Sequence, residues 1–228
     1  MLPNSSSGAP AWTPERFSGV SNAMLDALGL DDRLIRAPYH ANRETFPGNV
    51  FVTGRGPHCF VDSSFTRCLA VKNADLELFG CTFSGGAQPS AIRTESTHAR
   101  LVHCVVAGSV QCDRGRLDLE GSRISGNVLA RGLDLRLTSA TIHGTLDSDE
   151  LGLSIGPGSR VECLVMRLPA GAPPGAAQSV RLDFGASVGA CHFESSRFRV
   201  VQVNSRGHLV TVASSDVPDP PSGRTSST

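Results

Sequence analysis

The chain has 228 residues, with 21 Lys and Arg against 21 Asp and Glu, so its formal net charge at pH 7 is zero. A neutral chain lacks the basic surface that binds a phosphate backbone, which argues against a nucleic-acid partner. No apolar run approaches the roughly 18 residues of a transmembrane helix, and residues 1–12 lack the basic and apolar regions of a secretory signal. The seven cysteines, an odd number without a CxxC pair, favour a reducing compartment over a disulfide framework.

The two ends of the chain differ in composition from its middle. Residues 1–12 are rich in Ser, Pro, Gly and Ala, and residues 214–228 contain a single aliphatic residue, Val217. Neither segment can bury enough apolar surface to offset the entropy that it would lose on ordering. Both are therefore predicted to be disordered tails.

Residues 13–50 are predicted to form an N-terminal cap segment. Within it, Ser21 and Asn22 have the residue types that begin a helix, and Gly29 is a typical end. This short helix would carry the apolar side chains of Met24, Leu25 and Leu28.

An internal repeat organises residues 51–213, where short apolar alternations broken by Gly, Ser, Asp and Asn are typical of strands. Four aliphatic residues recur at a uniform spacing of 18: Leu101, Leu119, Leu137 and Ile155. An aliphatic-x-Gly-x-aliphatic phrase accompanies them at 106–110, 124–128 and 142–146, with an upstream copy at 83–87 that begins with Phe83 and a variant at 161–165 where Cys163 replaces the glycine. Strands this short cannot bury a face alone, but stacked coils bury one continuous core.

The spacing also decides which solenoid is expected. A hexapeptide helix needs an apolar residue at every sixth position, but steps of six from Leu119 and Ile124 reach Arg131 and Arg136. A buried arginine in every coil is not credible, so the hexapeptide helix is excluded. A pentapeptide repeat is excluded as well, because the five-residue period does not continue beyond residues 74–78. We therefore predict an all-β fold, a right-handed single-stranded parallel β-helix with coils of about 18 residues.

Charged residues occupy the outward positions of this repeat and should form ladders between neighbouring coils. Opposite charges that face each other across strands contribute roughly 0.2–1 kcal/mol per pair. The two expected ladders are Asp75, His98, Arg116 and Asp134, and Glu77, Arg100, Asp118 and Arg136.

The cysteines fall in columns that otherwise hold small residues, so we interpret them as small buried side chains. Cys81 and Cys104 align with Ser122 and Ala140, Cys112 aligns with Ala130 and Ser148, and Cys163 aligns with the repeated glycines. Cys81 and Cys104 would lie one coil apart, at roughly the 4.8 Å strand spacing, which leaves a bridge open in an oxidising setting. The seven histidines show no paired spacing and are expected at the surface. We expect no metal site, no cofactor and no catalytic residue.

The densest carboxylate cluster, Asp147, Asp149 and Glu150, raises the alternative of a carbohydrate-active enzyme. It lies where a coil turns, and turns favour Asp and Ser because their side chains bond the backbone. The chain also has a single lysine, Lys72. Two segments interrupt the period and are predicted to be insertions: the Pro, Ala and Gly run at 168–178, and residues 88–98.

The stretch from Ser125 to Val165 resembles the bactofilins, the polymer-forming cytoskeletal proteins, in its repeated aliphatic-x-Gly-x-aliphatic phrase followed by a short aliphatic strand. The matching positions are Ile124, Gly126, Val128, Leu135, Leu137, Ile142, Gly144, Leu146, Leu153 and Ile155. The match covers residues 99–168 well and 74–212 loosely. The resemblance implies a small β-helix between disordered tails that assembles end to end into nucleotide-independent filaments, often at the bacterial inner membrane.

These observations favour a non-enzymatic scaffold protein in the cytoplasm whose partner is another copy of itself, with the inner-membrane surface or cell-wall machinery as further partners. The alternatives are a secreted or host-delivered β-helix protein and, third, a small carbohydrate-active enzyme. The last strands are aliphatic and contain few polar residues that would prevent their edges from pairing with another chain. An end-to-end contact is therefore expected there. The residues expected to form it are Phe198, Val200, Val203, Val210 and Val212.

Overall fold

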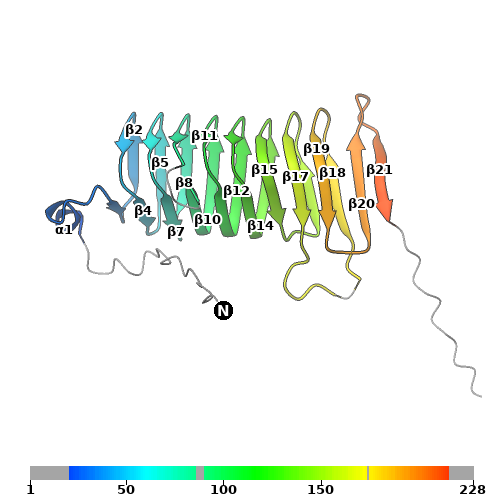
Figure 1. Ribbon diagram of the computed structural model, residues 1–228, viewed down its shortest axis with the longest axis horizontal. Helices are drawn as coiled ribbons and strands as arrows, with labels where there is room; N and C mark the ends of the chain where they lie inside the picture. Colours follow the sequence, from blue (N-terminus) through cyan, green and yellow to red (C-terminus); the bar gives the residue numbers. More distant parts are fainter. Residues whose placement is uncertain (1–20, 86–89, 174, 216–228) are drawn as a thin grey trace, which may run out of the picture.

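The computed structural model describes residues 21–85, 90–173 and 175–215. These residues form one short helix and 21 strands that belong to a single sheet wound into a parallel solenoid (Figure 1). The all-β class, the parallel stacking and the coil of about 18 residues are confirmed. The predicted tail 1–12 lies outside the described residues, as does nearly all of the tail 214–228.

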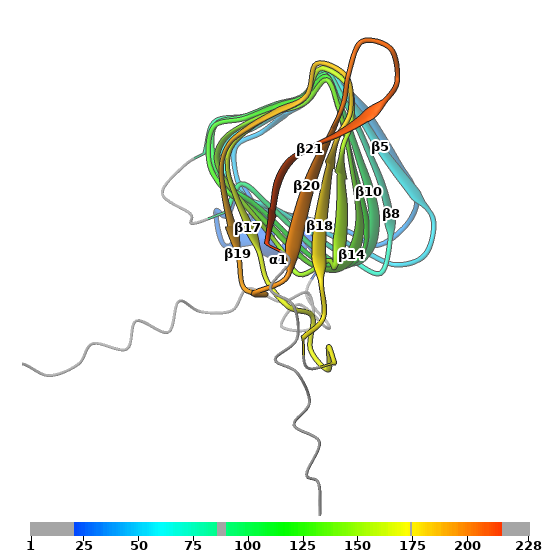
Figure 2. The ribbon, with the colours of Figure 1, turned by 90° about the vertical axis from the view of Figure 1, so that its right-hand side faces the viewer.

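Successive turns stack three columns of strands, one for each face of the solenoid (Figure 2). The first face begins with β1 (Arg33–Ile35), β4 (Val50–Thr53) and β7 (Leu69–Lys72). The second begins with β2 (Tyr39–Asn42), β5 (Pro57–Val61) and β8 (Asp75–Phe79). The third holds β3 (Thr45–Phe46), β6 (Ser64–Phe65), β9 (Thr82–Phe83), β11 (Val105–Val106) and β13 (Arg123–Ile124).

Later strands run through two faces without a break. β10 (Ile92–Val102), β12 (Val110–Glu120) and β14 (Val128–Thr138) each cover the first and second faces. β15 (Thr141–Ser148), β17 (Arg160–Met166) and β19 (Ser187–Phe193) run from the third face into the first, and β16 (Gly152–Ile155), β18 (Gln178–Leu182) and β20 (Phe198–Val203) occupy the second. β21 (Leu209–Ser215) turns back and pairs antiparallel with β20.

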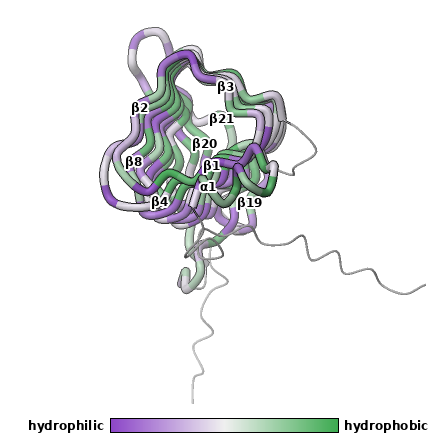
Figure 3. Tube along the Cα trace, turned by 90° about the vertical axis from the view of Figure 1, so that its left-hand side faces the viewer, coloured by the Kyte–Doolittle hydropathy of each residue, from purple (hydrophilic) through white to green (hydrophobic). Residues whose placement is uncertain are grey.

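The 18-residue column predicted from the sequence lies in register in the interior. Leu101 pairs with Leu119, Leu119 with Leu137, and Leu137 with Ile155, and all four are at most 2% exposed. The third face adds a stack of aromatic rings at its N-terminal end, where Phe65 lies 4.9 Å from Phe46 and 4.6 Å from Phe83 between ring centroids. Hydrophobic and hydrophilic residues alternate along the strands (Figure 3), so one continuous core fills the solenoid.

The repeated glycine allows neighbouring turns to approach closely at one corner. A Cβ at Gly126 would lie 2.6 Å from the carbonyl carbon and oxygen of Gly108, closer than real contacts permit. The alignment of Cys163 with this glycine column was wrong. The register shifts after Ile142, so that Cys163 faces Thr145, and Leu164, not Val165, takes the buried position beside Leu146.

The structure places the start of the solenoid and the first insertion differently from the sequence prediction. β1, β2 and β3 pair with the next turn, so the first turn begins at Arg33, inside the segment 13–50 assigned to a cap. Residues 92–98 are part of β10 and not of an insertion, because Ile92 pairs with Leu69 and the extra residues lie between Phe83 and Ile92. The second insertion is a loop, since the strands stop after Met166 and resume at Gln178.

Candidate functional site

The outer surface of the second face carries the two predicted charge ladders in the predicted register. Asp75, His98, Arg116 and Asp134 face one another in one column, and Glu77, Arg100, Asp118 and Arg136 in the next. All of them except Asp134 line, with the residues around them, a groove of about 650 Å³. This groove is the first candidate for a binding surface.

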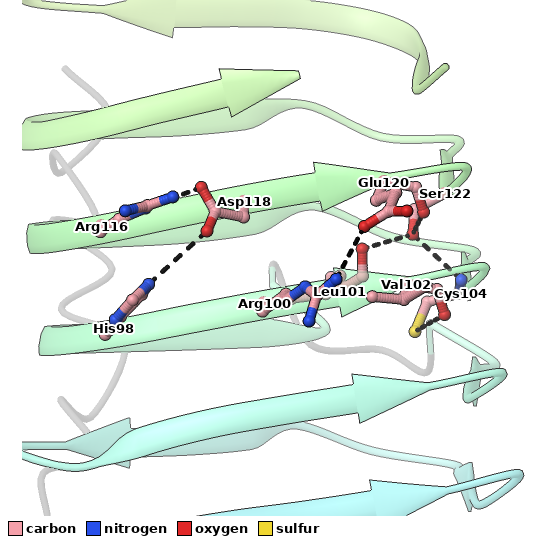
Figure 4. A network of polar contacts seen from close by, with 9 residues as sticks. All are labelled: His98, Arg100, Leu101, Val102, Cys104, Arg116, Asp118, Glu120 and Ser122. Atoms are coloured by element: carbon pink, nitrogen blue, oxygen red, sulfur yellow. Dashed lines mark hydrogen bonds and ion pairs between the residues drawn. The ribbon is translucent and has the colours of Figure 1, made fainter. Parts of the chain in front are cut away.

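The ion pairs in this groove run diagonally or along one strand, and not straight across as expected. Asp118 binds His98 diagonally at 3.5 Å and Arg116 on its own strand at 2.9 Å (Figure 4). Arg100 reaches past the facing Asp118 to Glu120 at 3.0 Å. These side chains are partly exposed, so each pair contributes at most about 1 kcal/mol. The groove is therefore a surface whose central charges are matched within the protein.

The carboxylate cluster at residues 147–150 bonds to the neighbouring turn. Asp147 forms ion pairs with Arg131 at 2.8 Å and with Arg167 at 3.0 Å. Asp149 accepts the N–H of Gly132 at 2.7 Å, and Glu150 accepts that of Leu135 at 3.0 Å. Burial raises the pKa of Glu150 to about 7, against the opposing effect of that backbone N–H. These contacts agree with the interpretation of the cluster as a turn.

One histidine departs from the expectation that all seven lie at the surface. His58 is 0% exposed and occupies the interior column of the second face, between Tyr39 and Leu76. Among the described residues neither ring nitrogen has a hydrogen-bond partner of normal geometry, and burial lowers the pKa of His58. The other six histidines are exposed. The burial of His58 could have been predicted from the sequence, because the residues in the same column of the later turns are all apolar.

The helix predicted from the sequence, α1 (Asn22–Ala27), lies at the N-terminal end of the solenoid, with Ser21 as its N-cap. The side-chain amide of Asn22 donates to the carbonyl of Leu34 at 3.0 Å and accepts the N–H of Leu34 at 2.8 Å. Leu25 is buried against Leu34 and Phe51 on the outside of the first face. Figures 1 and 3 show that α1 lies beyond the first turn, beside β1. Part of this end is therefore occupied by the chain itself.

The C-terminal end presents an uncharged strand. Among the described residues, β21 pairs with β20 alone, so its other edge is unpaired. Its sequence from Leu209 to Ser215 contains no charged residue, and Leu209, Val210 and Val212 are 59%, 47% and 54% exposed. An unguarded edge with exposed aliphatic side chains is the usual template for strand pairing with another chain.

The five residues expected at an end-to-end contact divide between these last two strands. Phe198, Val200 and Val203 lie on β20, whose edge is already paired with β21, and Val200 is 5% exposed. Val210 and Val212 lie on β21 and are exposed. A hairpin between the two sets reverses the chain direction. The sequences of the two strands predicted β-structure but did not predict this reversal.

Comparison with known proteins adds no relative: no family model, no curated protein and no solved structure matches this chain. Within the described residues, no helix is long and apolar enough to cross a membrane. The same residues contain no group of three or more His, Cys, Asp or Glu side chains placed to hold a metal ion.

Proposed function

We propose that this protein is a non-enzymatic structural protein of bactofilin type, which self-associates through the C-terminal end of its β-helix. The observation that carries the proposal is the edge of β21, which is unpaired among the described residues and belongs to a strand with three exposed aliphatic side chains and no charged residue of its own. A solenoid that works as a monomer would be expected to protect such an edge with charge, proline or a covering segment.

The geometry favours a closed dimer over an open filament. Two β21 strands can pair about a two-fold axis, and such a contact uses the same surface of both copies and closes on itself. A head-to-tail chain would need the opposite end of the solenoid to be open. There α1 projects past the first turn, and Asn22 satisfies the free peptide groups of Leu34. The cytoplasmic location and the membrane-surface or cell-wall partners stay predictions from the resemblance.

Sedimentation velocity of three proteins over a concentration series tests this proposal. Wild type should sediment as a dimer at tens of micromolar, and Val210→Lys should be monomeric because each edge would bring a charge into the contact. Val105→Lys is the matched control, since Val105 is also a strand valine with 47% exposure but lies on the third face. It should leave the dimer intact.

A monomeric wild type at these concentrations would overturn the proposal and favour the secreted or host-delivered alternative. Equal dissociation by the two lysine variants would also contradict it, because the contact would then not lie at the C-terminal end.

A further inference from the structure

Two cysteine side chains face each other on neighbouring turns at one corner of the solenoid. Thr82 pairs with Val105, and the N–H of Val105 donates to the carbonyl of Cys81 at 2.9 Å. Cys81 and Cys104 therefore occupy matching positions on adjacent parallel turns. Parallel strands lie about 4.8 Å apart, which is within the roughly 4.4–6.8 Å between Cα atoms that a disulfide spans.

Both thiols point into the same small space. Cys81 is 0% exposed and Cys104 is 1% exposed, and each thiol shifts the pKa of the other. Cys81 also donates to the carbonyl of Phe60 at 3.2 Å, and Cys104 to that of Leu78 at 3.4 Å. All seven cysteines are free thiols in this structure.

Packing alone does not require two cysteines here. In the next turn Ser122 takes the same corner, is 1% exposed, and donates to the carbonyl of Leu101 at 3.0 Å. Ser63, Ala140, Ser159 and Ala186 fill equivalent corners in other turns and are also buried. A serine thus makes the bonds that each cysteine makes. What two adjacent cysteines add is the ability to form a covalent bond between turns.

We propose that Cys81 and Cys104 are a disulfide site that joins two turns of the solenoid when the protein folds in the presence of a disulfide oxidant. The oxidant class is a small disulfide such as oxidised glutathione. One thiolate attacks it to give a mixed disulfide and one glutathione, and the second thiolate then displaces the other glutathione. Two cysteine thiols lose two electrons and two protons, and one glutathione disulfide becomes two glutathione molecules.

The bond should form before the turns close. In the folded protein the pair has almost no exposure to solvent; the neighbouring thiol and burial raise the pKa of Cys104, while its neighbour Cys104 lowers the pKa of Cys81. A disulfide oxidant must reach the attacking sulfur, so a pair of buried thiols exchanges slowly. The compartment in which the chain folds would then decide whether the two turns are joined.

The test uses the full chain, reduced and unfolded in guanidinium, then refolded in a buffer of reduced and oxidised glutathione. Free thiols are alkylated, and peptides are mapped by mass spectrometry without reduction. We expect one linkage, between the Cys81 and Cys104 peptides, with the other five cysteines alkylated. The melting temperature should rise by about 4 °C or more over the reduced protein. Incubating the already folded protein in the same buffer should give the linkage at least tenfold more slowly.

The double variant C81S/C104S is the matched control, because serine already occupies this corner in other turns. It should fold with the melting temperature of the reduced protein and show no rise in the oxidising buffer. Seven alkylated cysteines after refolding, or linkages that persist unchanged in the double variant, would overturn the proposal. Equally fast linkage in the already folded protein would also overturn the proposal, because it would show that the disulfide does not have to form during folding.

Discussion

The side chain of Asn22 completes the edge of the first strand through Leu34. Its amide donates to the carbonyl of Leu34 and accepts the N–H of the same residue, as a peptide group of a neighbouring strand would. On its other side, β1 pairs with β4 through residues that include Arg33, whose N–H donates to the carbonyl of Asn49. The solenoid therefore begins with a side chain in the place of a further turn.

Asn22→Ala should remove both hydrogen bonds and leave the Leu34 peptide groups without a protein partner. Each of the two bonds contributes about 0.5–1.5 kcal/mol, so we expect about 1–3 kcal/mol of lost stability. Native-state hydrogen exchange should show much faster exchange at the Leu34 amide. Met24→Ala, at an exposed position of the same helix, should leave that amide protected. Unchanged exchange in Asn22→Ala would show that the amide does not act as the edge partner.

Ile142→Asp and His143→Asp should differ sharply, because neighbouring strand residues point to opposite sides of the wall. Ile142 is 1% exposed in the core, and a buried unpaired charge costs several kcal/mol, on the order of half of a typical total stability. His143 is exposed and accepts a hydrogen bond from Arg123, which a carboxylate can also accept. We expect Ile142→Asp to unfold the central turns and His143→Asp to melt within about 2 °C of wild type. Equal melting temperatures would mean that inside and outside are assigned wrongly.

Glu150→Gln should stabilise the protein at pH 8 and have little effect at pH 4. Burial raises the folded pKa of Glu150 to about 7 from an ordinary value of 4.5. The folded state therefore holds the proton more tightly, and stability falls as the pH rises from 4.5 through 7. Glutamine keeps an oxygen for the N–H of Leu135 and removes the charge.

The expected gain at pH 8 is about 1–2 kcal/mol after a discount for the partial exposure of this carboxyl. Denaturant unfolding at several pH values measures it, with the exposed Glu162→Gln as the control. A variant that is less stable than wild type at pH 8 would contradict the prediction.

His58→Leu should stabilise the N-terminal turns, most of all in acid. The pKa of His58 is lowered by burial, so the unfolded chain binds its proton first, and stability is lost as the pH falls below about 6.5. Leucine fits the column, since Leu76 follows His58 in the next turn. Thermal melts at pH 5 and 7.5 should show a larger gain at pH 5, and the exposed His192→Leu should show neither. A gain independent of pH would mean that titration of His58 plays no part.

The sequence predicted the parts of this fold that repeat exactly. A uniform spacing of 18 placed Leu101, Leu119, Leu137 and Ile155 in one column, because residues one coil apart must face each other in a stack. The first two turns escaped this search. Their spacing varies, as between Val50 and Leu69, and their third face packs phenylalanines where later turns have the aliphatic-x-Gly phrase.

The two ends show why the candidate site could be predicted only in part. The aliphatic residues between 198 and 212 predicted strands at the C-terminal end. The alternation of apolar and polar residues does not say in which direction a strand runs, so the antiparallel pairing of β21 with β20 was not predicted. The helix near Asn22 was predicted from its capping residues. The contact between Asn22 and Leu34 joins residues 12 positions apart in the sequence. It could not be predicted, because it depends on where the first turn places the edge of its strand.

The most direct test of the assembly claim is the length of the particle in solution, measured by small-angle X-ray scattering on wild type and Val210→Lys. Association through the C-terminal ends should nearly double the maximum dimension of the wild-type particle relative to the lysine variant, with the cross-sectional radius unchanged. A wild-type particle of the same length as the variant, or one that is thicker but not longer, would contradict association through β21.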